Sequence, residues 1–176
     1  MSDSDRRARF QQLAMPLLDD ALNLACWLSG NRADAEDIVQ EAMLRAYKYL
    51  DRYTGGSFRP WLLAIVRNTA LTLLGQNRST RALFLAGDSA EQQAESTASD
   101  QPSPEEALTQ RRLSDQVNQA VANLPPEFRE VIILREMHDL SYKEISGVLE
   151  IPIGTVMSRL SRARKLLMDA LPDYAT

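Results

Sequence analysis

The stretch from Leu140 to Lys165 constrains the fold most, because it carries the signals of two helices joined by a tight turn. Ser141 and Glu144 have the spacing of a capping box, which predicts that a helix starts here. Pro152 cannot continue that helix. Gly154 is expected to allow a close approach or a positive φ in the turn. Together these signals predict a helix-turn-helix.

The second predicted helix has two chemically different faces. The apolar face, expected to pack on a core, consists of Val156, Leu160, Ala163 and Leu167. The polar face consists of Thr155, Ser158, Arg159 and Arg162. Small hydroxyls let a helix approach a major groove, and arginine can bond guanine edges bidentately. The alternative is a solvated basic face, but four basic residues and no acidic one between 152 and 165 favour DNA contact. Thr155 is also expected to cap this helix.

The composition of the 176 residues predicts an all-α protein of one or two small domains, because glycine is scarce and few stretches alternate with period two. The apolar runs are too short to cross a bilayer, and the first residues lack a signal-peptide core, so a cytoplasmic protein without membrane insertion is expected. Cys26 and His138 are the only residues of their kinds, so no disulfide, metal site or cofactor is expected. His138 is expected to be exposed in a turn.

The net charge of −4 is unevenly distributed along the chain. Six acidic residues and no basic one lie between Ala82 and Gln110, so the remainder holds 20 basic against 18 acidic residues. The same region is rich in Ser, Ala and Gln, with Pro-Ser-Pro near its end. We therefore expect a flexible acidic linker over residues 82–106, between one domain at 1–81 and another at 107–176.

A strong amphipathic helix is predicted from Asp34 to Tyr49, with Asp34 as its N-cap. Its apolar residues keep helical spacing without a break. The opposite face is polar except for Leu44, which is expected to be exposed. A single exposed leucine is normal, but it is also what an interface anchor with a polar rim looks like.

Residues 51–60 form a predicted loop that mixes aromatic side chains, arginines and an adjacent glycine pair. This composition suits a surface that stacks unpaired bases and neutralises phosphates. The side chains in question are Arg52, Tyr53, Phe58 and Arg59. The alternative is a plain connection in which Phe58 and Trp61 fill the core, and we assign Trp61 to the core.

Two blocks of the sequence resemble the extracytoplasmic-function (ECF) sigma factors of the sigma-70 family. The first block consists of Asp34–Glu41, Phe58–Leu62 and Ile65–Asn68. The second consists of Leu124–Glu130, Leu140–Ile145 and Gly154–Arg164. The resemblance implies sigma region 2 at residues 1–81 and sigma region 4 at 107–176. It also implies an alternative sigma factor that directs promoter-specific initiation by core RNA polymerase, is held inactive by an anti-sigma factor, and threads its linker into the polymerase.

The resemblance further implies three sets of contact residues. The set for core polymerase is Asp37, Gln40, Glu41, Leu44 and Arg45. The set for the −10 promoter element is Arg52, Tyr53, Ser57, Phe58, Arg59, Arg67 and Asn68. The set for the −35 element is Thr155, Met157, Ser158, Arg159, Ser161, Arg162 and Lys165. Met157 stands where many relatives have a basic residue, and Thr72 and Gly75 also depart from the family pattern, which leaves the promoter preference open.

Two other classes of protein were weighed. A stand-alone helix-turn-helix regulator would use the same C-terminal block, but it would normally bind as a dimer, and the first domain shows no heptad seam. An enzyme is the weakest alternative, because the sequence has no phosphate-binding glycine loop, no nucleophile–histidine set and no cluster of metal ligands. Promoter DNA and polymerase, rather than a small-molecule substrate, are the expected partners.

Overall fold

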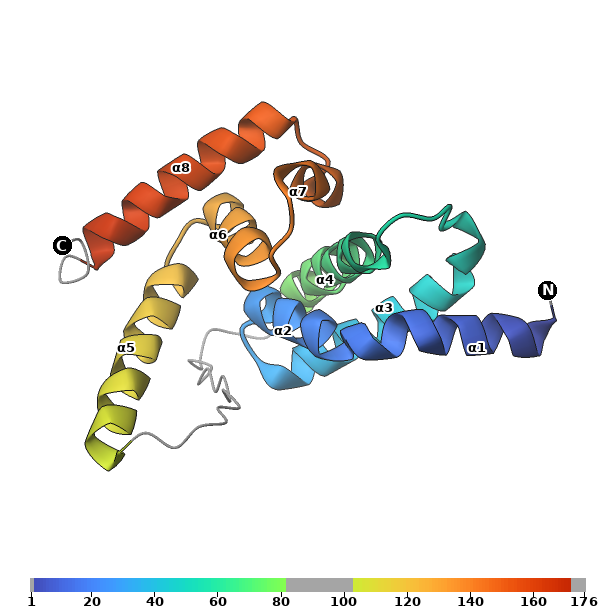
Figure 1. Ribbon diagram of the computed structural model, residues 1–176, viewed down its shortest axis with the longest axis horizontal. Helices are drawn as coiled ribbons and strands as arrows, with labels where there is room; N and C mark the ends of the chain where they lie inside the picture. Colours follow the sequence, from blue (N-terminus) through green and yellow to red (C-terminus); the bar gives the residue numbers. More distant parts are fainter. Residues whose placement is uncertain (1, 82–102, 172–176) are drawn as a thin grey trace. The chain divides into compact units, whose positions relative to one another are not determined.

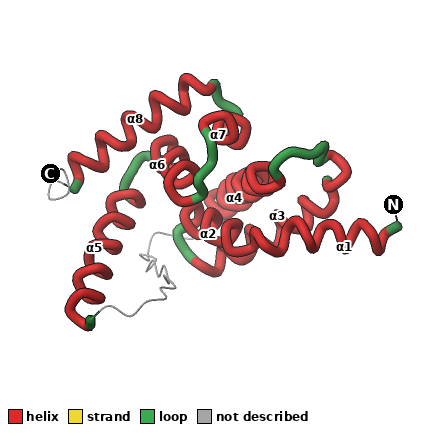
Figure 2. Tube along the Cα trace, viewed as in Figure 1, coloured by secondary structure: helices red, strands yellow, loops and turns green. Residues whose placement is uncertain are grey.

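The computed structural model describes residues 2–81 and 103–171, and every regular element in these ranges is helical (Figures 1 and 2). The helices form two compact units, which confirms the predicted all-α fold with two small domains. Residues 82–102, most of the expected linker, lie outside the described residues. The last three residues of the expected linker belong to a helix that begins at Pro104.

The first unit contains α1 (Asp3–Ala14), α2 (Leu18–Ser29), α3 (Arg32–Lys48) and α4 (Phe58–Arg81), with short 3-10 helices η1 (Met15–Leu17) and η2 (Leu50–Arg52). Helices α2, α3 and α4 pack against one another. Small side chains allow this close packing, since seven alanines are 0% exposed: Ala14, Ala21, Ala25, Ala35, Ala42, Ala46 and Ala70. Larger apolar side chains fill the spaces between the helices, among them Leu24, Ile38, Leu62 and Leu63.

The N-cap of α3 is Asn31, not Asp34 as the sequence predicted. The Asn31 side chain accepts a hydrogen bond of 2.8 Å from the Asp34 backbone nitrogen. Its amide donates one of 2.7 Å to the Asp34 carboxylate. Gly30, with φ of 80°, is the C-cap of α2, and Asn31 follows in an extended conformation. Helix α3 therefore begins at Arg32, two residues earlier than expected. Asp34 still suits the positive end of the helix dipole.

The second unit contains α5 (Pro104–Ala122), α6 (Pro126–Ile132), the π-helical segment η3 (Ile133–Met137), α8 (Ile153–Ala170), and α7 (Tyr142–Leu149) as far as Ser146. Helix α8 packs on α6, and α5 contacts both. The core comes from all of the last four elements and includes Val131, Ile133, Leu134, Ile145, Val156 and Leu160. Both helices of the helix-turn-helix therefore contribute buried apolar side chains to this core.

His138 is buried, at 1% exposed, and the expectation of an exposed turn residue is wrong. The helical segment continues up to this residue, because the His138 backbone nitrogen bonds to the Ile133 carbonyl at 3.2 Å. His138 therefore lies four positions after Leu134, on the same buried side. The chain turns only afterwards, at Asp139, which has φ of 51°.

Candidate nucleic-acid interface

The capping box predicted at the start of the helix-turn-helix is present. The Glu144 backbone nitrogen donates to the Ser141 hydroxyl at 3.1 Å, and the Ser141 backbone nitrogen donates to the Glu144 carboxylate at 2.8 Å. These two bonds satisfy amides that have no partner within the helix. The first helix of the motif thus begins where the sequence placed it, and it buries Ile145, Val148 and Leu149.

The turn between α7 and α8 is built differently from the prediction. Its positive φ, 55°, belongs to Glu150. Gly154 instead lies in the first turn of α8, and no atom lies within 4 Å of an ideal Cβ placed on it, so neither role expected of it is present. The N-cap is Pro152, and the Thr155 backbone nitrogen donates to the Pro152 carbonyl at 2.9 Å. Thr155 is therefore inside the helix and is not its cap.

Helix α8 turns its apolar side chains inward and leaves the expected DNA-binding residues accessible. Val156, Leu160 and Ala163 are at most 1% exposed. The exposed members of the set are Met157, Ser158, Ser161, Arg162 and Lys165. Thr155 and Arg159 are half-exposed. One helix thus presents hydroxyls, an apolar side chain and basic groups along a single surface.

The basic residues of α8 differ in their ionic partners. Arg164 pairs with Glu136 of η3 at 2.9 Å, which raises the pKa of the Arg164 guanidinium and ties α8 to its support. Within the part of the chain that the structure describes, neither Arg162 nor Lys165 forms an ion pair. Two charges on the accessible side of the helix are therefore free to meet phosphates or base edges.

The outer face of α3 has the arrangement expected of a protein-binding surface. Leu44 is 63% exposed, which agrees with the prediction of an accessible apolar residue. Asp37 and Gln40 are exposed. Glu41 and Arg45 are half-exposed and form an ion pair of 2.7 Å. An apolar side chain surrounded by charged groups can bury its surface against a partner while its rim stays solvated.

The loop between α3 and α4 has an accessible tip and an aromatic base. Gly55 and Gly56 take positive φ values of 107° and 85°, and the Tyr53 hydroxyl donates to the Gly56 carbonyl, which closes the turn. Arg52 and Ser57 are exposed, and the Arg52 guanidinium lies 4.6 Å from the centre of the Tyr49 ring. The tip can therefore present a cation and flexible backbone to an anionic ligand.

Phe58 does not lie on this surface. It is 5% exposed, and its ring lies 5.2 Å from that of Tyr53 and 5.1 Å from that of Trp61. Its ring fills the base of the loop and is not accessible to a stacking base. Trp61, assigned to the core, is only half-buried.

The remaining residues of the −10 set are less free than the sequence suggested. Arg59 is half-buried and pairs with Asp20 of α2 at 3.2 Å, so part of its charge is used within the unit. Arg67 is half-buried and Asn68 exposed on α4, where the Asn68 carbonyl accepts a hydrogen bond from the Thr72 hydroxyl at 3.0 Å. Arg52, Tyr53 and Ser57 belong to the connection between α3 and α4, whereas Arg67 and Asn68 lie farther along the chain in α4.

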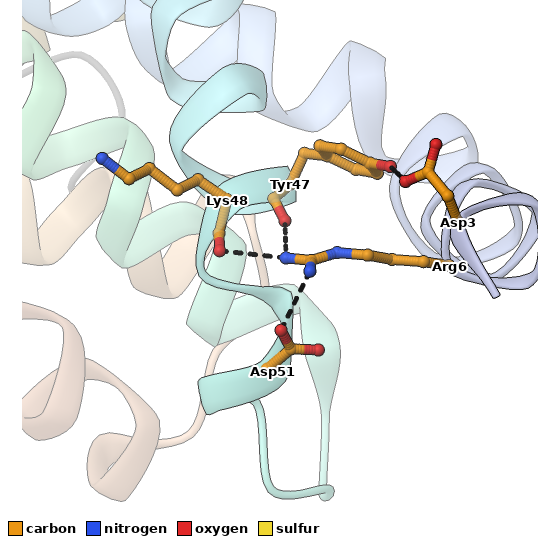
Figure 3. Close-up of polar contacts among 5 residues, drawn as sticks. All are labelled: Asp3, Arg6, Tyr47, Lys48 and Asp51. Carbon is orange, nitrogen blue, oxygen red and sulfur yellow. Dashed lines mark hydrogen bonds and ion pairs between the residues drawn. The ribbon is translucent and has the colours of Figure 1, made fainter. Parts of the chain in front are cut away.

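Sequence reasoning missed Arg6, which fixes the end of α3 (Figure 3). Its Nη2 donates to the backbone carbonyls of Tyr47 and Lys48 at 2.9 and 3.0 Å, and its Nη1 lies 3.0 Å from the Asp51 carboxylate. The guanidinium also lies over the Tyr47 ring, whose hydroxyl donates to Asp3 at 3.2 Å. Helix α1 thereby holds the point from which the candidate DNA-binding loop departs. No local pattern signals this contact, because its partners are far apart in the sequence.

Comparison with known proteins identifies the family. Residues 13–80 match the model for Sigma-70 region 2, and residues 114–167 match that for Sigma-70, region 4. The RNA polymerase sigma-H factor of Pseudomonas aeruginosa is 34% identical over 170 residues, covering 95% of this chain and 88% of that protein. The ECF RNA polymerase sigma factor SigW of Bacillus subtilis is 33% identical, with 88% and 84% covered. The chain belongs to the ECF sigma factors of the sigma-70 family. This membership favours a sigma factor over the stand-alone regulator considered from the sequence.

A further relative and two solved structures are similar to this chain. The ECF sigma factor SigE of Mycolicibacterium smegmatis is 35% identical over 173 residues, and the chain spans 65% of that protein's length. The fold matches the sigma factor RpoE of Bartonella quintana, solved with the anti-sigma factor NepR, at a TM-score of 0.77 and 24% identity over 93% of this chain and 97% of that one. It also matches CnrH, solved with the cytosolic domain of CnrY, at a TM-score of 0.63 and 25% identity over 96% and 90%.

The described residues of this ECF sigma factor contain neither a membrane-spanning helix nor a candidate metal site. None of the helices in residues 2–81 and 103–171 has the length and apolar character needed to cross a bilayer. In the same ranges, no group of three or more His, Cys, Asp and Glu side chains is arranged to hold a metal ion.

Proposed function

We propose that this ECF sigma factor binds core RNA polymerase through the outer face of α3 and reads promoter DNA with two separate surfaces. Helix α8 reads the −35 element, and the loop between α3 and α4, with Arg67 and Asn68, reads the −10 element. The observation that carries the proposal is the conjunction of the two family regions with an accessible, hydroxyl-rich and basic α8.

The polymerase contact centres on Leu44. Its side chain is the most exposed large apolar group among the described residues, and Asp37, Gln40, Glu41 and Arg45 surround it on the same helix face. Burial of one leucine contributes roughly 1.5–3 kcal/mol, so this side chain can act as the anchor of the contact. The charged rim then sets orientation and partner choice.

The residues of α8 contribute to the −35 contact in different ways. Arg162 and Lys165 supply charge, and Ser158 and Ser161 allow close approach to the groove. Arg159 is half-exposed beside Thr155, where it can reach a base edge or a phosphate. The −10 contact relies on Arg52, Tyr53 and Ser57 of the connection between α3 and α4, since Phe58 is enclosed.

An anti-sigma factor is the regulator that we propose. CnrH, which shares 25% identity and the fold, was solved with the cytosolic domain of CnrY, and the Bartonella relative with NepR. A protein that covers the face around Leu44 would prevent assembly with polymerase. In this account the chain acts in the cytoplasm as an initiation factor, and it performs no catalysis of its own.

An assembly experiment tests the proposal. Purified chain is mixed with core polymerase and separated by size, and binding of promoter duplexes is measured with and without the polymerase. The proposal predicts a stable complex and promoter binding that depends on it. Tight duplex binding by the chain alone, without a polymerase complex, would support the stand-alone regulator instead.

A further inference from the structure

Two exposed apolar side chains lie at the start of α8. Ile153 is 49% exposed and Met157 is 53% exposed, whereas Val156 and Leu160 beside them are at most 1% exposed. Ile153 and Met157 are four residues apart, so they are neighbours on one side of the helix. Met157 belongs to the expected −35 set, but charge and hydroxyl contacts with DNA do not explain why this edge of α8 is apolar.

The apolar edge borders the surface that faces DNA in the proposed function. Ser158 and Ser161 follow Met157 around the helix and are exposed. In helix-turn-helix proteins, the N-terminal residues of the recognition helix contact base edges in the major groove. Ile153 and Met157 lie in the first two turns of α8, which begins next to α7 (Figure 1).

The chemistry of Met157 limits what it can contact in a groove. Its thioether donates no hydrogen bond and accepts only weakly, so it suits neither a phosphate nor a guanine edge. The apolar group that base pairs present in the major groove is the C5-methyl of thymine. A flexible, polarizable side chain is well adapted to cover such a methyl group.

We infer that Met157, with Ile153 beside it, is a specificity residue that contacts the C5-methyl group of a thymine in the −35 element. The inference rests on the proposed function of α8 and adds the base that this helix favours at one position. Cytosine has no methyl at that carbon and is therefore disfavoured there.

The charge around the apolar edge favours DNA over a protein as its occupant. Between residues 151 and 168 the sequence contains four basic residues and no acidic one. Two of the four, Arg162 and Lys165, are exposed and have no ion pair in the described part of the chain. A polyanion can approach both the apolar edge and these cations at once.

Replacement of thymine by deoxyuridine removes the methyl group alone and provides the test. The full chain with core polymerase is used to recover −35 elements from promoters randomised in that region. Each thymine of the recovered element is then changed singly to deoxyuridine, and promoter affinity is measured. One such change is expected to weaken wild-type binding about fourfold, the contribution of one methyl-sized group buried.

Three variants make the test specific. Met157→Ala is expected to bind the thymine and deoxyuridine promoters equally, and Met157→Leu to keep the difference. Met168→Ala is the matched control, because Met168 is 60% exposed on the same helix but lies three turns farther from its start. It should respond like the wild type.

Two results would overturn the inference while leaving the sigma factor role intact. One is normal initiation from recovered elements in which no thymine is sensitive to deoxyuridine. The other is equal sensitivity in the wild type and in Met157→Ala. If the chain supports no initiation at all, the proposed function fails, and this inference fails with it.

Discussion

Arg6 of α1 and Asp51 of η2 form an ion pair of 3.0 Å that ties the first helix to the turn opening the candidate −10 loop. The same guanidinium caps the C-terminal end of α3, because it donates hydrogen bonds to the carbonyls of Tyr47 and Lys48. A cation at this end of a helix also suits the helix dipole. The loop is therefore positioned by a residue that touches no DNA in this account.

Replacement of Arg6 by alanine should lower the stability of the first unit by about 1–2 kcal/mol, because hydrogen bonds from a charged group to helix-end carbonyls are lost. Faster hydrogen exchange in α1 and in residues 50–57 is the measurement. Asp51→Asn should cost less than about 1 kcal/mol, since the carboxylate is 62% exposed.

Arg7→Ala is the control for that experiment. Arg7 is 71% exposed, and its pair with Asp3 measures 3.8 Å, so its loss should have almost no effect on stability. Equal effects of the Arg6 and Arg7 changes would contradict the capping role of Arg6.

Leu44→Asp should abolish or strongly weaken assembly with core polymerase and leave the helix content and thermal unfolding unchanged. The reason is that the side chain is 63% exposed and contributes little to the core. Met15→Asp, at a side chain that is 58% exposed in the same unit, introduces the same charge elsewhere and should still assemble. Unfolding of the Leu44 variant would show that this residue belongs to the core.

Arg162→Ala should weaken binding to the −35 element by roughly 1–3 kcal/mol if the guanidinium contacts a base. Lys165→Ala should instead weaken binding to all sequences alike. It should also reduce the magnitude of the slope of log binding constant against log salt concentration by about 1, as expected for a phosphate contact. Arg164→Ala is the comparison, because that charge is already paired with Glu136. An equal response of all three variants to sequence and salt would contradict this division of roles.

Gly154→Ala should stabilise the second unit by about 0.5–1 kcal/mol, because alanine is the better helix former and the site is open. Glu150→Gly should also be stabilising or neutral, since glycine tolerates the φ of 55° found at residue 150. Chemical denaturation of the chain measures both. Destabilisation by Gly154→Ala would contradict this, and it would indicate that residue 154 has the positive φ expected from the sequence.

Local signals of the sequence were sufficient for the helix-turn-helix. The capping box of Ser141 and Glu144, the buried stripe of α8 and the exposure of Leu44 follow from helical spacing and from polar groups three or four residues apart. Such signals involve neighbours along the chain, so they are visible without a fold. The all-α class follows from the scarcity of glycine and of period-two alternation, and the two-domain organisation follows from the acidic composition of residues 82–106.

Choices between equivalent local solutions were harder to predict. Asn31 and Asp34 can both cap a helix, and the end of α2 at Gly30 decided between them. Glu150 rather than Gly154 took the left-handed conformation, because the turn falls directly after α7. His138 could have been recognised as buried, since it continues the spacing of Val131 and Leu134.

Contacts between segments far apart in the chain could not be predicted from the sequence. Arg6 meets the end of α3 only after both helices have packed, and Arg59 meets Asp20 across the first unit. Phe58 was weighed both as a DNA contact and as a core residue, and its burial by Tyr53 and Trp61 required the folded loop. These contacts determine which of the expected site residues are accessible.

Run-off transcription by core polymerase on genomic promoter fragments, with and without the chain, tests the central claim most directly. Specific initiation is expected only when the chain is present, and it should be lost in Leu44→Asp. Absence of initiation, together with tight and specific duplex binding by the chain alone, would contradict it.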